Sequence, residues 1–157
     1  MKHRKILFLI FVFLWMGMIF TMSSRNGDLS GNDSSLAGQF IGQHFVKGFE
    51  DWSKDNQQRF IEAVDHPIRK TAHASEYCVL GILFVGAYVD NKKKIKLRII
   101  VPWICGTLYA ISDEFHQLFV PGRSGMITDV FIDSIGVLVG AIIVNVLYKF
   151  LQFLQNS

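Results

Sequence analysis

The sequence predicts an all-α fold, an integral membrane four-helix bundle with a partly helical extracellular segment between its first two membrane helices. Half of the 157 residues are hydrophobic, and they are concentrated in four continuous blocks. Each block, extended by a few tolerant neighbours, reaches the ~20 residues that a helix needs to cross a bilayer. Because the blocks do not alternate apolar and polar residues, helices rather than a β-barrel are expected to satisfy the backbone in lipid.

We place the membrane helices at about 6–22, 70–89, 98–118 and 128–150, with an outer segment at 23–68. No internal repeat or low-complexity tract divides the chain, so a single membrane domain is expected over 1–157. The first block is bulky up to Phe20 and lacks a small-residue cleavage site. These features favour a retained helix over a cleaved secretory signal peptide.

Lysine and arginine residues near the membrane ends predict the orientation of the bundle. Three of them precede the first block, and five more lie in the connection DNKKKIKLR after the second. Such residues remain on the cytoplasmic side of a membrane. We therefore expect a multi-pass protein with cytoplasmic N and C termini, whose segment 23–68 and connection after the third helix lie outside.

The outer segment 23–68 is expected to begin as a loop, because SSRNGDLSGNDSS is small and polar. Phe40, Phe45 and Phe49 follow at nearly helical spacing, which predicts one or two amphipathic helices on the outer face of the membrane. Pro67 suits the first turn of a helix that Asp65 or His66 would cap. The second membrane helix is thus expected to start shortly before its apolar part.

Three of the predicted helices carry polar stripes, because residues three, four and seven positions apart share a helix face. The predicted orientation puts all three stripes in the outer half of the membrane, where charged groups avoid lipid only by facing one another. Glu114 is turned about 100° from the stripe of its helix. The stripes are Arg69, His73, Glu76 and Tyr77; Tyr109, Asp113, His116 and Gln117; and Asp129, Asp133, Gly136 and Gly140.

Carboxylates outnumber basic side chains in this polar region, with Glu76, Asp113, Glu114, Asp129 and Asp133 against Arg69, Lys70 and Arg123. The excess requires a protonated carboxyl, a charged histidine, water, a cation or a cationic ligand group. Ion pairs that only fix helix packing do not need such an excess, so we interpret the region as a functional site. The spacing of Gly136 and Gly140 is typical of close approach between helices.

Four stretches can be compared with known families: MSSRNGDLS (22–30), RKTAHASEY (69–77), SDEFHQLFVPGR (112–123) and DVFIDSIG (129–136). Together they resemble the VanZ family, and the resemblance extends over nearly the whole chain. It implies a small four-helix protein of the bacterial plasma membrane, in a family whose namesake is linked to resistance to the glycopeptide antibiotic teicoplanin. Membership does not by itself establish resistance or chemistry.

The first functional hypothesis is binding. An outer cavity would hold a lipid head group, or a glycan or peptide component of the cell envelope, and so contribute to teicoplanin resistance. The partners would be membrane lipids and a lipid-linked envelope precursor or a lipoglycopeptide. Basic side chains would hold a phosphate or carboxylate, and acidic ones would accept from amines or hydroxyls. The expected ligand-binding residues are Arg69, Lys70, Tyr77, Glu114, Gln117, Arg123, Asp129 and Asp133, with Asp113 beside them.

The alternative hypothesis is an integral membrane enzyme that acts on an envelope lipid or precursor. His73 or His116 would be the general base, oriented by Glu76 or Asp113. A divalent metal ion is a further alternative, with His73 and Glu76 as two of its ligands. The sequence nevertheless assigns no metal site and identifies no cofactor. A proton pathway would need a polar route through the inner half of the membrane helices, and the sequence does not supply one. A scaffold or partner-binding role is the remaining alternative. The short basic loop gives no support to nucleic-acid binding.

Overall fold

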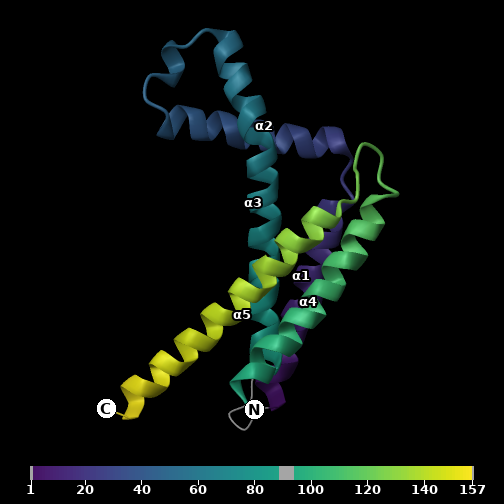
Figure 1. Ribbon diagram of the computed structural model, residues 1–157, viewed down its shortest axis with the longest axis vertical. Helices are drawn as coiled ribbons and strands as arrows, with labels where there is room; N and C mark the ends of the chain where they lie inside the picture. Colours follow the sequence, from purple (N-terminus) through teal and green to yellow (C-terminus); the bar gives the residue numbers. More distant parts are fainter. Residues whose placement is uncertain (1, 89–93, 157) are drawn as a thin grey trace.

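A computed structural model describes residues 2–88 and 94–156, and all regular structure in these ranges is helical. The elements are α1 (Lys2–Ser23), α2 (Gly27–Phe45), the short 3-10 helix η1 (Phe49–Asp51), α3 (Lys54–Tyr88), α4 (Ile95–Gln117) and α5 (Ile127–Asn156). Helices α1, α3, α4 and α5 form the body of the molecule, and α2 lies across one end of it (Figure 1).

Helix α3 is the central element, and it packs against α1, α2, α4 and α5. Hydrogen bonds along its length connect α1 to its neighbours: the Trp15 indole donates to the carbonyl oxygen of Glu76 at 2.9 Å, and the Tyr109 hydroxyl donates to that of Met16 at 2.6 Å. An apolar core lies between the helices, and its buried members are Val12, Ile19, Tyr77, Leu80, Ala110 and Val137. A smaller cluster contains Val85 and Ala141.

Helices α3 and α5 approach each other closely because α5 has glycines at the contact. A Cβ atom at Gly136 would collide with the backbone oxygen of Ala74, and one at Gly140 with that of Cys78. Only a residue without a side chain allows the two backbones this separation. The close approach predicted from the Gly136 and Gly140 spacing is therefore confirmed.

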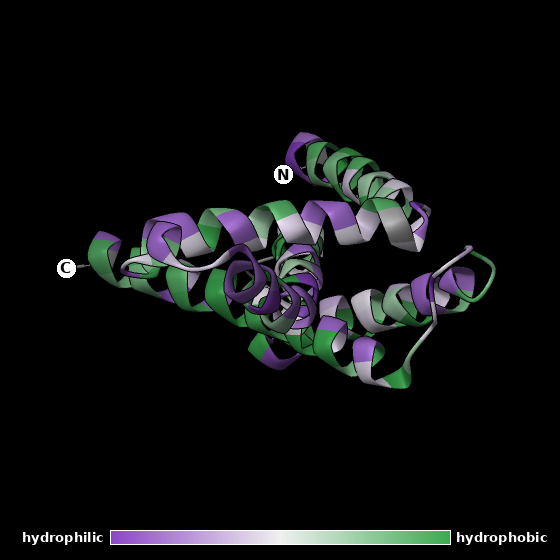
Figure 2. Cartoon of the chain, turned by 90° about the horizontal axis from the view of Figure 1, so that it is seen from above, coloured by the Kyte–Doolittle hydropathy of each residue, from purple (hydrophilic) through white to green (hydrophobic). Residues whose placement is uncertain are grey.

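Apolar side chains cover much of the outside of the bundle. Phe13, Leu108 and Phe131 are each more than 60% exposed, and Figure 2 shows hydrophobic residues along the long helices. Within the described residues, three helices are long and apolar enough to cross a membrane: His3–Ser23, Ile95–Gln117 and Ile127–Gln155. The predicted second span, 70–89, is not among them; it forms part of α3, and its last residue lies outside the described residues.

The outer segment departs from the prediction at its start. Helix α2 begins at Gly27, so most of the polar stretch expected to be a loop is helical. The side chain of Asn26 accepts a hydrogen bond from the backbone N–H of Leu29 at 2.9 Å, which caps the first turn. The small polar residues predicted a loop, whereas the cap at Asn26 favours a helix that begins at Gly27.

The predicted start of the second membrane helix is wrong. Helix α3 begins at Lys54, and Pro67 lies well inside it rather than in a first turn capped by Asp65 or His66. Two observations explain the continuation: Ile61 and Val64 pack against α2 at Gly38, and Pro67 is exposed, so the helix bond lost there faces solvent. Tertiary contact with α2 thus outweighs the local cost of proline.

The ends of the long helices are sorted to opposite ends of the molecule. In Figure 1 four helix ends lie toward the end of the molecule that carries both termini: the start of α1, the end of α3, the start of α4 and the end of α5. Helix α2 and the connection 118–126 lie toward the other. Residues 89–93, which include two of the five basic residues of the connection DNKKKIKLR, lie outside the described residues.

Candidate functional site

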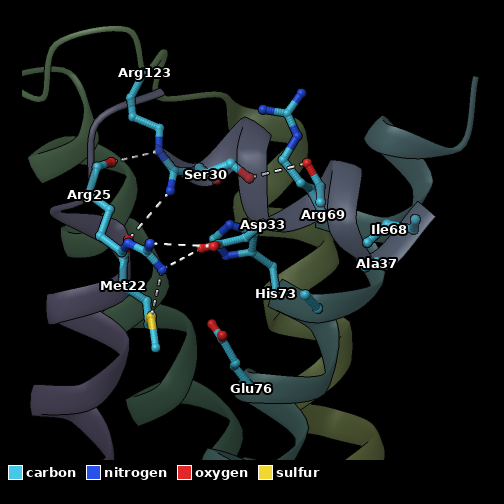
Figure 3. A pocket seen from close by; sticks show the side chains of 12 residues that line it. Met22, Arg25, Ser30, Asp33, Ala37, Ile68, Arg69, His73, Glu76 and Arg123 are labelled. Carbon is cyan, nitrogen blue, oxygen red and sulfur yellow. Dashed lines mark hydrogen bonds and ion pairs between the residues drawn. The ribbon is translucent and has the colours of Figure 1, made fainter. Parts of the chain in front are cut away.

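A polar cavity of about 250 Å³ lies between α1, α2, α3 and the connection 118–126. Helix α3 supplies one wall because Arg69, His73 and Glu76 fall on the same helix face, as predicted. Helix α2, lying across α3, covers the cavity from the side of Asp33 and Ala37 (Figure 3). Its charged lining residues are Arg25, Asp33, Arg69, Glu76 and Arg123, with His73 beside them.

A second cavity, of about 160 Å³, shares Arg69, His73 and Arg123 with the first. The other polar residues that line it are His66, Lys70, Gln117, Ser124 and Asp129. The two spaces therefore adjoin across a wall of two arginines and one histidine. We refer to them below as the larger and the smaller cavity.

Ion pairs neutralise most of the cations around the cavities. Arg25 pairs with Asp33, and Lys70 of α3 pairs with Asp129 of α5. Arg69 pairs with Asp65 one turn earlier on α3, at 2.5 Å. Asp65 also accepts a hydrogen bond from Ser34 of α2, which joins α2 to the upper part of α3.

Arg123 differs from these cations in having only backbone acceptors. Its Nε donates to the carbonyl oxygen of Arg25 at 3.2 Å, and one terminal nitrogen donates to that of Met22 at 3.4 Å. Within the described residues, no carboxylate lies within 4 Å of its guanidinium. Burial, and then the nearby charge of Arg69, lower the pKa of Arg123 from its usual value, yet a guanidinium remains charged at any physiological pH.

The connection that carries Arg123 is held against the start of α2. Gly122 has a φ of 72°, which an L side chain rarely adopts, and it lies against Gly27. The N–H of Gly27 donates to the carbonyl oxygen of Pro121 at 3.1 Å. The PGR turn and the beginning of α2 thus position the arginine together.

A second group of predicted residues forms a buried acidic network at the end of α4. The Ser23 hydroxyl donates to Asp113 Oδ2 at 2.8 Å, and the Gln117 amide donates to Asp113 Oδ2 at 3.4 Å and Glu114 Oε1 at 3.3 Å. The N–H of Met126 donates to Glu114 Oε2 at 2.8 Å. Although Glu114 is turned from the Asp113 face, the connection 118–126 folds over it and buries it as well.

Several buried polar atoms in and beside this network have no partner among the described residues. They are His73 Nδ1, Tyr77 Oη, Asp113 Oδ1 and both carboxylate oxygens of Asp133, which is 0% exposed. An unpaired buried polar atom costs about 1–3 kcal/mol, so proteins leave few of them. Their concentration on three helices distinguishes this region from an ordinary packed core.

The two histidines of the enzyme hypothesis have different surroundings. His116 Nε2 lies 3.1 Å from Ser24 Oγ, and its ring contacts Phe20. Because the Ser24 hydroxyl donates to the carbonyl oxygen of Phe20 at 2.7 Å, the imidazole acts here as a donor to Ser24. In the described structure no hydrogen bond joins His116 to Asp113 or His73 to Glu76.

The geometry also bears on the metal alternative. Over residues 2–88 and 94–156, no group of three or more His, Cys, Asp and Glu side chains is arranged to hold a metal ion. His73 and Glu76 share a face of α3 and line the larger cavity, but no third ligand completes a set with them.

The sequence prediction missed the contribution of α1 and α2. Ser23 and Arg25 at the end of α1, and Asp33 and Ser34 on α2, all contact predicted site residues or line the larger cavity. The stretch MSSRNGDLS, which contributed to the family resemblance but was not assigned a role, contains Ser23 and Arg25. Asp33 and Ser34 lie just after it, in the polar stretch that was expected to be a loop.

Comparison with known proteins gives one positive result. The model of the VanZ/LLP1 family matches residues 8–148, which is most of the chain and includes every predicted site residue. Searches of curated proteins and of solved structures return no significant match. The resemblance seen in the four sequence stretches is therefore confirmed, and the chain belongs to the VanZ/LLP1 family.

Proposed function

We propose that the chain is a four-span protein of the bacterial plasma membrane in which α3 supplies the fourth span. Helix α3 has 35 residues, about 52 Å at 1.5 Å per residue, whereas the hydrocarbon core is about 30 Å thick. Its second half packs between α1, α4 and α5, and Tyr77, Leu80 and Val85 are fully buried there. Neighbouring helices would shield its polar residues from lipid, and its first half would project outside with α2.

In the proposed orientation both termini are cytoplasmic, and α2 and the connection 118–126 face outward. The basic residues before α1 and after α3 support it, because such residues stay on the cytoplasmic side. In Figure 1 the start of α1 and the end of α5 lie toward the same end of the molecule, which agrees with an even number of spans. Both cavities would then lie in the outer part of the membrane.

We propose that the adjoining cavities bind the polar head group of a cell-envelope lipid or lipid-linked precursor. The observation that carries the proposal is Arg123, a half-buried cation with no carboxylate partner among the described residues. A phosphate oxygen pair matches the donor geometry of a guanidinium and supplies the missing negative charge. Lys70, Asp129, Gln117 and Arg69 would line the ligand in the smaller cavity.

Cavity size supports a head group over a larger ligand. The volumes of about 250 and 160 Å³ fall below the ~300–1,000 Å³ typical of pockets for drug-sized molecules. A lipoglycopeptide is much larger than such molecules, so it would not be enclosed. A contribution to teicoplanin resistance would therefore come from holding an envelope lipid at the outer surface rather than from enclosing the antibiotic.

The test is lipid retention by the purified full-length protein, measured by native mass spectrometry after washing with phosphatidylglycerol. Arg123→Gln removes the uncompensated charge, whereas Arg59→Gln removes an exposed arginine of α3 and serves as the matched control. A hydrogen bond to a charged group contributes about 1.5–3 kcal/mol, so Arg123→Gln is expected to reduce retention about tenfold or more.

Equal retention by both variants would remove the proposal. The same experiment separates binding from the enzyme alternative. A lipid that the wild type returns with a changed mass, but that His73→Gln returns intact, would establish chemistry at the larger cavity instead.

A further inference from the structure

The foot of the larger cavity is a carboxylate without a cationic partner. Figure 3 shows Glu76 below Arg25, Asp33 and His73, with its carboxylate directed into the space. In the part of the chain that the structure describes, this carboxylate makes no hydrogen bond and no ion pair within 4 Å. Glu76 contributes only its backbone oxygen to the packing, as acceptor from Trp15.

The nearby cations are engaged elsewhere. Arg25 is bound to Asp33 across the cavity from Glu76, and Arg69 is bound to Asp65. A carboxylate in a half-enclosed site is stabilised by a positive charge or by hydrogen-bond donors close to it. For Glu76 such a partner would have to come from a bound molecule.

The cavity thus presents two unpaired charges of opposite sign at different depths. Arg123 lies at the rim, on the connection 118–126 that is held against the start of α2, and Glu76 lies at the foot. On α3, Glu76 is two turns below Arg69, a separation of about 10 Å along the helix axis. A ligand that carries an anion near one end and a cation near the other would satisfy both charges at once.

The lining also indicates which kind of cation would fit. A quaternary ammonium is usually held by the faces of aromatic rings. The described lining of the larger cavity contains no Phe, Tyr or Trp; its apolar members are Met22, Ala37, Ile68 and Ala72. A primary ammonium, which has three N–H donors, matches a bare carboxylate better.

We propose that the larger cavity recognises a phosphate linked to a primary amine, with the phosphate at Arg123 and the ammonium group at Glu76. This inference rests on the proposed function, because it specifies the head group bound by the same site. The shared chemistry is that of phosphoethanolamine, which is available either as the head group of a phospholipid or as a soluble molecule.

The experiment offers the full-length protein equal amounts of phosphatidylethanolamine, phosphatidylcholine and phosphatidylglycerol in mixed micelles and measures the retained lipids by native mass spectrometry. The wild type is expected to prefer phosphatidylethanolamine over the other two by about tenfold or more. Glu76→Gln should abolish the preference for phosphatidylethanolamine. Glu76→Asp, which keeps the charge, should restore part of it, and Glu62→Gln, an exposed carboxylate on α3, should behave like the wild type.

A wild type without preference, or a Glu76→Gln protein that keeps it, overturns the inference. If the three lipids are retained equally and all depend on Arg123, the proposed head-group site stands and only its amine selectivity fails. If no retention depends on Arg123, the proposed function fails as well. Displacement of the bound lipid by soluble phosphoethanolamine supports recognition of the free head group, and retention despite it supports the lipid-borne form.

Discussion

A methyl group at Gly140 is expected to separate α5 from α3. The added Cβ would overlap the backbone oxygen of Cys78, and a backbone atom within a helix cannot move aside as the tip of a side chain does. Overpacking of this kind costs about 1–3 kcal/mol and sometimes more, while replacing glycine by alanine in a helix returns at most about 1 kcal/mol. A clash with backbone belongs at the upper end of this cost, so Gly140→Ala should lower the free energy of unfolding by about 2 kcal/mol.

The matched control is Gly17→Ala on α1, where no atom lies within 4 Å of the added Cβ. This variant should be neutral or slightly stabilised by the higher helix propensity of alanine. Reversible unfolding in mixed micelles by sodium dodecyl sulfate, followed by circular dichroism, gives both values. Tryptophan fluorescence adds a local signal, because the Trp103 indole donates to Ser134 across α4 and α5 at 2.8 Å. Equal stabilities for the two variants would refute close backbone contact between α3 and α5.

Three further outcomes are expected. Ser23→Ala should cost about 1–3 kcal/mol of stability in the same unfolding assay, because it removes the shorter of the two hydrogen bonds to Asp113 Oδ2; no measurable loss would contradict the buried network. Alanine substitutions of Lys70 and Asp129 should be non-additive by about 0.5–3 kcal/mol in a double-mutant cycle, whereas additive costs would show that the pair is not formed. In a cysteine-free background, Ser124→Cys should react with an impermeant maleimide on intact cells, whereas Lys96→Cys should react only after permeabilisation. The reverse pattern would invert the proposed topology.

Local sequence patterns predicted the helices well where the face defined by residue spacing is also the face that packs against another helix. The glycine spacing on α5 predicted a close contact, and the glycines do meet the backbone of α3. The same reasoning failed at Pro67 and at the start of α2, because Asn26 caps one helix and contact with α2 extends the other. A cap or a tertiary contact contributes about as much free energy as local propensity, so propensity alone did not decide these boundaries.

The candidate site was only partly predictable for a related reason. Periodicity placed Arg69, His73 and Glu76 on one face of α3, and they share the larger cavity. The same rule placed His116 beside Asp113, yet His116 contacts Ser24 of the α1 end while Asp113 is bound by Ser23. Helix periodicity defines a face, but the rotation of each neighbouring helix determines what that face meets.

The amino-acid sequence by itself determined the family, the helical class and the apolar blocks, because these depend on composition and on short-range spacing. It also determined which helix faces carry charged side chains, because a face follows from residue spacing alone. Only the tertiary structure decided which charges neutralise one another. Among the described residues, Arg123 and Glu76 are left without an oppositely charged partner, whereas Arg25, Arg69 and Lys70 are paired. Ion pairing depends on distances of a few ångströms between residues far apart in the chain, and those distances exist only once the helices have packed.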